Sequence, residues 1–515
     1  MSRLISFIGF ILLSAGQLLA QDGLRIMESL VMPSRIMNQD VKYSVCLPDD
    51  YYVSGKSYPV VYMLHGLGDD ETAWLEYGRI SQYYDALIGV SSVVPMIFIM
   101  PQGYRTYYVN DYQGKFLYQD MLIEELVPFI DQHFSTIPDK QHRGLIGYSM
   151  GGYGALILHL QHPDVFGSAV PLSISIRTDE QYMTEYGPEW DEQWGRLFGA
   201  VGIEGPGRIT DYYKANNPFH IIPKIPPSEM NQYRIYIDNG DKEQTLCRSN
   251  EELHILMQNL NFPHEFRVRE GGHSFEYWCS ALPNALNFLS DAFEGKPYRG
   301  DVRAQGNIET DMNLVHPETF SIGPVQFEVF LPEEFNNTNR KYPALYISGN
   351  FGSEQVRKIV SEINLAVQSN EIGPMVIINL YDYSLDKITS LIPRIEDKFR
   401  LRNDFHFRSI IGYRESAEQV CNLVTSQVLF SSSVLVDAYL QKDHVIKMIN
   451  EMPEDALKKT PFFIIAPSSG NYYEGNGNLH MMFRDKEIKH EYRVIEEEGE
   501  ITKEIIHFIS DNFHR

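Results

Sequence analysis

The segment Gly147–Gly152 reads Gly-Tyr-Ser-Met-Gly-Gly, and its surroundings decide the fold. The apolar run Gly144–Ile146 predicts a strand before it, and the alanine- and leucine-rich run Ala155–Leu160 predicts a helix after it. A Gly-x-Ser-x-Gly sequence at a strand-to-helix turn holds its serine in a strained conformation that exposes the hydroxyl, and the glycines leave room around it. Ser149 is therefore a candidate nucleophile; the alternative is a glycine-rich surface turn.

A serine nucleophile requires a histidine that accepts its proton and a carboxylate that orients the histidine. In a fold with this strand-to-helix turn the chain order is serine, acid, histidine. His273 fits the last place, because it lies on a glycine-rich loop just after the strand-like stretch Glu265–Arg269. We expect His273 to be the base; the alternative is a solvated loop histidine.

The acid is expected one strand earlier, after the strand-like stretch Tyr233–Ile237. Spacing favours the loop beyond Gly240 over Asp238, which we assign to the strand end. Two candidates then remain open, and either carboxylate could orient an imidazole: Asp241 and Glu243.

Attack on a carbonyl places negative charge on its oxygen, and backbone N–H groups can stabilise that charge. The N–H of Met150, directly after Ser149, is one candidate donor. The loop His65–Gly68 follows the apolar strand-like run Val60–Leu64, and we nominate the N–H of Leu67 as the second donor. We interpret His65 as a structural residue that braces this loop.

These motifs together resemble the esterase D and feruloyl esterase family, carbohydrate esterases of the α/β-hydrolase class. The family also includes S-formylglutathione hydrolases and, more distantly, the mycolyl-transferring antigen 85 proteins. The resemblance covers about Asp40–Glu294, and the matching segments are Leu64–Gly68, Gly147–Gly152, Ile237–Gly240 and Gly271–Trp278. It implies Ser149 as nucleophile, His273 as base, and Leu67 and Met150 as oxyanion donors.

The resemblance also bears on the acid. Family members usually carry it three residues after the glycine that here is Gly240, which favours Glu243 over Asp241. Most members have aspartate there, whereas antigen 85 proteins use glutamate, so this chain departs from the common pattern. The interval between Glu243 and His273 leaves room for one helix and one strand, as the family's order of elements requires.

Residues 1–20 have the pattern of a secretory signal peptide. Arg3 precedes the apolar run Leu4–Leu13, and a polar break leads to the small residue Ala20. Ser6, within the apolar run, and the polar break interrupt the stretch, which disfavours a membrane anchor. We therefore expect a secreted or periplasmic protein with no membrane association after removal of the signal.

The chain contains an internal repeat at a constant offset. Lys42–Pro48 returns as Gln326–Pro332, and Tyr58–Gly68 returns as Tyr342–Gly352. The second copy lacks the candidate catalytic residues. Arg414 aligns with Ser149, Gly499 with His273 and Gly349 with His65. We predict an α/β-hydrolase esterase domain over residues 21–296. Residues 305–515 are expected to form a degenerate α/β-hydrolase-like domain that packs against the first, shapes its cleft or binds glycan.

The expected fold class is α/β, with two tandem domains that each have a mostly parallel sheet covered by helices. An insertion over residues 177–217 is expected to cap the cleft, with Trp190 and Trp194 either facing it or forming the cap's core. In the first domain we expect strands near 41–47, 59–65, 94–100, 143–148, 167–172, 233–238 and 264–269. Helices are expected near 117–134, 152–162, 249–260 and 281–294.

Composition excludes several classes of function. A formal net charge of −24 over 515 residues, without a basic cluster, disfavours nucleic acid and other polyanionic partners. No Cys and His cluster has metal-ligand spacing, and the chemistry requires no cofactor. The default for the four cysteines is ordinary buried thiols, with a bridge between Cys247 and Cys279 as the alternative.

Aromatic residues are frequent in the segments expected to form the active-site loops. Their rings could stack on an aromatic acyl group or a sugar ring, or they could simply pack the loops down. Tyr104 and Tyr112 belong to this set, and the four substrate-contact candidates are Trp74, Tyr107, Tyr108 and Trp278.

The sequence thus predicts a serine esterase acting through an acyl-enzyme, with feruloyl or acetyl esters of carbohydrate as the expected substrates. One alternative keeps the same residues but transfers the acyl group to an alcohol or sugar. The other is a non-catalytic glycan-binding protein, which the intact chemistry of the first copy disfavours.

Overall fold

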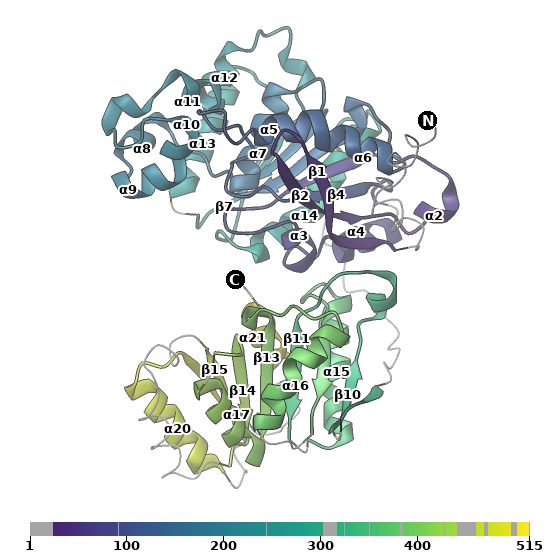
Figure 1. Cartoon of the computed structure of the whole chain (residues 1–515). Helices are drawn as coiled ribbons and strands as arrows, with labels where there is room; N and C mark the ends of the chain where they lie inside the picture. Colours follow the sequence, from purple (N-terminus) through teal and green to yellow (C-terminus); the bar gives the residue numbers. More distant parts are fainter. Residues whose placement is uncertain are drawn as a thin grey trace, which may run out of the picture. The chain divides into compact units, whose positions relative to one another are not determined.

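The computed structural model of the chain has two compact units, Met1–Gln305 and Gly306–Arg515 (Figure 1). The predicted signal segment 1–20 and Gly499 lie outside the described residues. The described residues are 24–90, 92–243, 245–301, 317–323, 325–349, 351–381, 385–426, 428–439, 460–467, 472–495 and 502–513.

In the described part of the first unit, eight strands form one sheet in the order β1-β2-β4-β3-β5-β6-β7-β8. β1 and β2 pair antiparallel with each other and β2 with β4, whereas the strands from β4 and β3 through β8 run parallel. β3 to β7 are buried along their whole length, which explains the continuous apolar sequences of β3 and β4, while β7 carries the buried polar residues Asp238 and Asn239. The strands are β1 (Ile26–Ser34), β2 (Gln39–Cys46), β3 (Val60–Leu64), β4 (Ile97–Pro101), β5 (Arg143–Tyr148), β6 (Ser168–Leu172), β7 (Tyr236–Gly240) and β8 (Glu265–Arg269).

Helices cover both faces of this sheet and enclose two apolar clusters. One face packs against α4 (Ile80–Gly89) and α14 (Phe275–Phe293). The other packs against η1 (Met121–Leu126), α6 (Val127–His133), α7 (Met150–Gln161) and α13 (Thr245–Asn259). Among the helices of the described segments, none is both long and apolar enough to cross a membrane.

The second unit repeats this architecture. Its described strands form a sheet in the order β9-β10-β12-β11-β13-β14-β15-β16, which is the order of the first sheet strand for strand. The predicted pair of mostly parallel α/β sheets is therefore confirmed. The strands are β9 (Glu318–Ile322), β10 (Val325–Phe330), β11 (Ala344–Ser348), β12 (Val376–Asn379), β13 (Arg408–Tyr413), β14 (Ser432–Val436), β15 (Phe462–Pro467) and β16 (His490–Ile495). Its helices include α15 (Ser353–Gln368), α16 (Leu385–Lys398), α17 (Glu415–Ser426), α20 (Tyr473–Asp485) and α21 (Thr502–Asp511).

A pair of histidines is preserved in both units. His254 Nδ1 lies 2.8 Å from His264 Nε2 in the first unit, and His480 Nδ1 lies 2.8 Å from His490 Nε2 in the second. In both units the first histidine also stacks on the ring of the residue two positions after the second one. The duplication therefore extends to side-chain contacts between a helix, α13 or α20, and the last strand of each sheet.

The insertion over 177–217 folds into short helical segments with an aromatic core of their own. Trp190 and Trp194 are both buried, and the rings of Tyr182 and Trp190 lie 5.6 Å apart. The guanidinium of Arg208 lies 4.5 Å from the ring of Trp190 and donates to backbone carbonyls of the insertion. The two tryptophans thus form the core of the cap. The segments are α8 (Asp179–Thr184), α9 (Gly187–Trp190), η3 (Asp191–Gly195), α10 (Arg196–Phe198), η4 (Gly205–Arg208) and α11 (Asp211–Ala215).

The cysteines are all free thiols, so the alternative of a bridge between Cys247 and Cys279 is wrong. Each sulfur has a different neighbour: Cys247 Sγ lies 3.4 Å from the carbonyl oxygen of Gly240, and Cys279 Sγ lies 3.4 Å from that of Tyr77. Within the described segments, no group of three or more His, Cys, Asp or Glu could hold a metal ion.

His159 on α7 is a buried neutral histidine whose titration should make the first unit sensitive to acid. Its Nδ1 donates to the carbonyl of Phe166 at 3.1 Å, and its Nε2 accepts from the N–H of Arg234 at 3.2 Å. Burial lowers the pKa of His159 to about 4. The unfolded chain takes up this proton near pH 6.5, so the free energy of unfolding is expected to fall from pH 6.5 to pH 4, by about 3 kcal/mol in total.

This expectation is tested by urea unfolding at pH 7 and pH 4.5, for the natural protein and for His159→Gln. All four tryptophans belong to the first unit, so their fluorescence reports its unfolding. The variant should lose less stability than the natural protein between the two pH values. Equal losses in the two proteins would show that His159 does not contribute to the pH dependence.

Candidate active site

The turn after β5 holds Ser149 in a strained conformation, with φ 56° and ψ −116°. The N–H of Ser149 donates to the carbonyl of Leu172 at 3.0 Å, which ties the turn to the end of β6. A Cβ atom at Gly147 would lie 2.0 Å from the carbonyl oxygen of Gly151, and one at Gly151 would lie 2.1 Å from that of Leu64. Both positions require glycine, which is the physical reason for the motif.

The structure brings Ser149, His273 and Glu243 together in a hydrogen-bonded series. His273 Nε2 lies 2.9 Å from Ser149 Oγ, and His273 Nδ1 lies 3.0 Å from Glu243 Oε2. The Glu243 side chain is fully buried, whereas that of His273 is 37% exposed. Because an ionised carboxylate only accepts, Nδ1 carries the proton and Nε2 is left to accept the proton of Ser149.

Asp241, the alternative acid, does not occupy the place beside His273. Its Oδ1 accepts from the N–H of Gly271 at 3.0 Å, so it fixes the backbone of the histidine loop.

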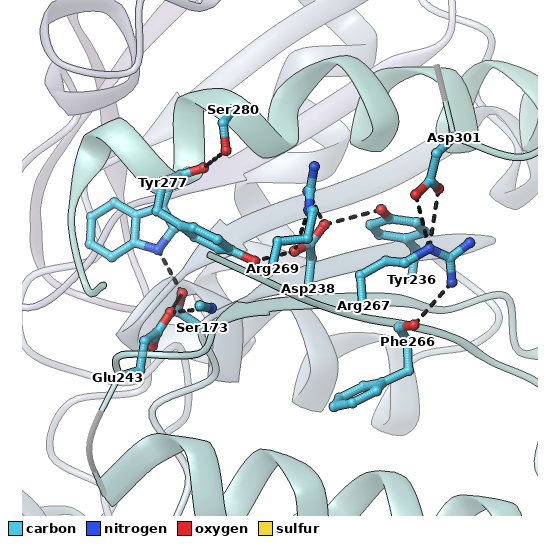
Figure 2. Close-up of polar contacts among 12 residues, drawn as sticks. Ser173, Tyr236, Asp238, Glu243, Phe266, Arg267, Arg269, Tyr277, Ser280 and Asp301 are labelled. Carbon is cyan, nitrogen blue, oxygen red and sulfur yellow. Dashed lines mark hydrogen bonds and ion pairs between the residues drawn. The ribbon is translucent and has the colours of Figure 1, made fainter. Parts of the chain in front are cut away.

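Asp238 lies within β7, as expected, and is part of a separate buried cluster (Figure 2). It pairs with Arg269 and accepts from the hydroxyls of Tyr236 and Tyr277. Burial raises the pKa of Asp238, and the opposite charge of Arg269 counteracts this effect. The cluster anchors the start of α14, directly after the histidine loop.

The two nominated oxyanion donors lie on segments that meet at Ser149. Met150 begins α7, and the first N–H groups of a helix have no acceptor within it. Leu67 belongs to the loop after β3. A Cβ at Gly66 would lie 2.5 Å from the ring of Tyr148 and 3.5 Å from Cβ of Ser149, so this loop lies directly against the nucleophile turn. The hydroxyl of Tyr148 also donates to Asp69 Oδ2 at 2.6 Å and fixes the far end of the loop.

His65 has a bracing position in the structure. It is buried, and its Nδ1 donates to the carbonyl of Gly66 at 2.8 Å. Its Nε2 accepts from the N–H of Gly103 at 2.7 Å, and its carbonyl accepts from the hydroxyl of Tyr108 at 3.0 Å. These bonds connect the loop after β3 to the loop after β4, as the structural interpretation of His65 requires.

The four aromatic residues expected to contact substrate lie in the interior instead: Trp74, Tyr107, Tyr108 and Trp278. Their relative exposures are 0%, 1%, 0% and 5%, so none offers an open ring face. The indole of Trp74 donates to the carbonyl of Leu64 at 3.1 Å, and the ring of Tyr107 packs on Trp194 at 4.4 Å. These large rings fill the space behind the loops, which corrects the expectation.

A cavity of about 760 Å³ lies between three segments of the first unit: the loop after β3, the loop after β4 and the cap. Residues from these segments include Gly68 and Asp69, then Tyr104 and Phe116, then Leu197 and Val201.

Ser173 is a site residue that sequence reasoning missed. It follows β6 and is completely buried, and its hydroxyl donates to Glu243 Oε1. No motif marks it, because a single serine after an apolar strand is common in any α/β protein.

The second unit keeps the geometry of the turn without its chemistry. Arg414 takes the place of Ser149, with φ 51°, and its N–H donates to the carbonyl of Val436 at 3.0 Å. Its Nε lies 3.2 Å from Asp437 Oδ2. A turn of this shape therefore does not require a serine.

Comparison with known proteins places the first unit among esterases. Residues 34–289 match the model of the family described as Esterase. An esterase of Mycobacterium tuberculosis is 29% identical over 252 residues, which are 45% of this chain and 52% of the relative. An endo-1,4-beta-xylanase/feruloyl esterase of Xylanibacter ruminicola is 37% identical over 131 residues, 24% of this chain and 18% of that protein. A solved ferulic acid esterase structure has a TM-score of 0.45 at 26% identity, covering 51% of this chain and 96% of its own. The chain spans about half the length of the M. tuberculosis relative.

Proposed function

Because residues 34–289 belong to the esterase family, we propose that the first unit is a serine esterase that hydrolyses carboxylic esters through an acyl-enzyme. The observation that carries this proposal is the hydrogen-bonded series from Ser149 through His273 to Glu243. Nucleophile, base and orienting acid stand in the order and at the distances that acyl transfer requires.

In the first half of the reaction, Ser149 Oγ attacks the ester carbonyl carbon while its proton moves to Nε2 of His273. The carbonyl oxygen becomes an oxyanion that faces the N–H groups of Met150 and Leu67. Glu243 stabilises the imidazolium through Nδ1. The proton then passes from Nε2 to the ester oxygen, the alcohol leaves, and the acyl group stays on Ser149.

In the second half, a water molecule takes the place of the departed alcohol. His273 Nε2 accepts a proton from the water as its oxygen attacks the acyl carbon. Collapse of the second tetrahedral intermediate breaks the bond to Oγ, and the proton returns from Nε2 to Ser149. The carboxylic acid leaves, and the starting state is restored.

The order of strands indicates which part of the ester lies in the cavity. Glu243 follows β7 and His273 follows β8, on one side of Ser149, whereas the loops after β3 and β4 that line the cavity lie on the other. The alcohol must leave beside His273, because it receives its proton there. The acyl group therefore extends from Ser149 toward the cavity, whose wall does not include Ser149 itself. Apolar wall residues such as Phe116 and Leu197, together with a volume of about 760 Å³, suit a bulky acyl group better than acetyl, and Arg105 and Arg196 add polar groups to the same wall.

We place the alcohol in the carbohydrate class. The relative from X. ruminicola combines a xylanase with a feruloyl esterase by name, and the net charge of −24 favours a neutral substrate. An extracellular polysaccharide ester would also suit a chain whose first 20 residues we propose to be a secretory signal.

The proposal is tested with methyl ferulate, acetylated xylan and 4-nitrophenyl acetate, and with a Val201→Trp variant. Val201 lines the cavity and is 55% exposed, so a larger ring there should narrow the cavity without disturbing the core. We expect kcat/KM for methyl ferulate to fall about tenfold or more, and that for 4-nitrophenyl acetate to stay within about twofold.

The matched control is Ile255→Trp on α13, because Ile255 is 53% exposed and is not part of the cavity wall. This variant should hydrolyse both esters like the natural protein. If the natural protein hydrolyses none of the esters and does not react with a fluorophosphonate, the esterase proposal is wrong. Equal losses on both esters in Val201→Trp would refute only the placement of the acyl group.

A further inference from the structure

The hydroxyl of Ser173 is a fully buried group beside the acid of the proposed triad (Figure 2). Ser173 has φ 47°, a conformation that a residue other than glycine adopts only where the surrounding structure imposes it. Its N–H donates to the carbonyl of Asp238 at 2.8 Å, which fixes the backbone at this point. The side chain contacts both Glu243 and Trp278.

The direction of these hydrogen bonds follows from the groups involved. The indole N–H of Trp278 can only donate, and it lies 2.7 Å from Ser173 Oγ. The single proton of the Ser173 hydroxyl is then directed to Glu243 Oε1. The bonds therefore run in one direction, from Trp278 through Ser173 to the carboxylate.

This arrangement decides which carboxylate oxygen is left for the histidine. Glu243 Oε1 accepts from Ser173 and also from the N–H of Gly240 at 2.9 Å. A glutamate has three rotatable side-chain bonds, and a single bond to His273 would leave the carboxylate free to turn about the last of them. Two donors at Oε1 remove that rotation and hold Oε2 toward His273 Nδ1.

The second unit provides an internal comparison. Strand register aligns Tyr148 with Leu172 in the first unit and Tyr413 with Val436 in the second, so Asp437 stands where Ser173 does. Asp437 keeps the backbone conformation, with φ 46°, and its N–H also donates to the next strand. The fold therefore does not require serine here. In the second unit, where Arg414 replaces the nucleophile, Asp437 replaces Ser173. A carboxylate at this position would repel an acid such as Glu243.

We propose that Ser173, itself held by Trp278, is a positioning residue that fixes the carboxylate of Glu243 for its bond to His273. This inference rests on the proposed esterase function of the same site. It assigns to Trp278 an indirect part in catalysis in place of the expected contact with substrate.

The first test is Ser173→Gly, which removes the hydroxyl and suits the positive φ. We expect kcat for 4-nitrophenyl acetate to fall about tenfold to a hundredfold, with KM within about twofold. The buried N–H of Trp278 loses its acceptor, so the unfolding temperature should fall slightly, and kcat is measured well below it. Trp278→Phe should cause a smaller loss, and the double variant should lose no more than Ser173→Gly, because both changes act through one series of bonds.

The second test is Ser173→Asp, which copies the residue of the second unit. A second carboxylate beside Glu243 favours protonation of the acid and of His273, so the acid limb of the pH profile of kcat/KM should move to higher pH. The readout that a merely structural role would not give is the loss of kcat at unchanged KM in Ser173→Gly.

The control is Ser168→Ala, which removes a buried hydroxyl at the opposite end of β6 and should leave kcat and the pH profile unchanged. The inference fails if the natural protein is an active esterase and Ser173→Gly retains its kcat, or if the acid limb of Ser173→Asp does not move. An inactive natural protein would instead contradict the esterase function on which the inference rests.

Discussion

Replacement of Ser149 by alanine is expected to lower kcat for 4-nitrophenyl acetate by at least about 10⁴-fold. The covalent route disappears with the hydroxyl, and the oxyanion donors and bound substrate alone support only a small residual rate. The fold should be unaffected, because alanine is no larger than serine and the turn is held by backbone bonds and glycines. Steady-state assays measure kcat, labelling with a fluorophosphonate reports the reactive hydroxyl, and a thermal unfolding curve reports the integrity of the fold.

The internal repeat supplies a matched control for this experiment. Arg414→Lys changes the corresponding position of the second unit, where the turn has the same shape, and keeps the positive charge beside Asp437. This variant should retain full activity and full labelling, since that position holds no nucleophile. Activity that survives in Ser149→Ala but is lost in Arg414→Lys would move the chemistry to the second unit and contradict the assignment.

The sequence predicts the parts of this site that depend on backbone geometry. Glycines at Gly147 and Gly151 have a local steric cause, so the motif alone indicates the turn that presents Ser149. The internal repeat is equally visible, because a copied sheet keeps its apolar strands and its turn residues. The mostly parallel pairing in both sheets follows from these local signals together with the preference of alternating strands and helices for parallel pairing, whereas these signals do not fix the order of the strands.

The sequence does not predict which way a side chain points or at which residue a helix begins. Trp278 lies in the first turn of α14, just after the loop that carries His273, but nothing in the sequence indicates that its ring faces inward and donates to Ser173. The helix expected from residue 281 begins at Phe275, and Pro283 within it is the signal that favours a later start. The four cysteines are free thiols, as the default interpretation expects, and the alternative bridge between Cys247 and Cys279 fails because placement after two neighbouring loops does not fix the separation of two sulfurs.

Replacement of Glu243 by glutamine is expected to lower kcat by about 10⁴-fold, as a wrong histidine tautomer does in a serine protease. Asp241→Asn should change it less than about threefold. Asparagine keeps an oxygen that accepts from the N–H of Gly271, so the histidine loop keeps its shape. Both rates are measured at saturating ester, with the unfolding temperature of each variant. A larger loss in Asp241→Asn would assign the acid to Asp241.

The size of the Glu243→Gln effect follows from the donors that surround this carboxylate. In the natural protein, Glu243 Oε1 accepts from the Ser173 hydroxyl and from the N–H of Gly240. Because both groups are donors, the amide oxygen of the glutamine, and not its NH₂ group, must occupy this position. The amide NH₂ then takes the place of Oε2 and faces Nδ1 of His273. Nδ1 is forced to accept, the imidazole proton moves to Nε2, and a protonated Nε2 pointing at Ser149 cannot take the proton of its hydroxyl. The same network that holds the acid in the natural protein therefore locks the variant in the inactive tautomer.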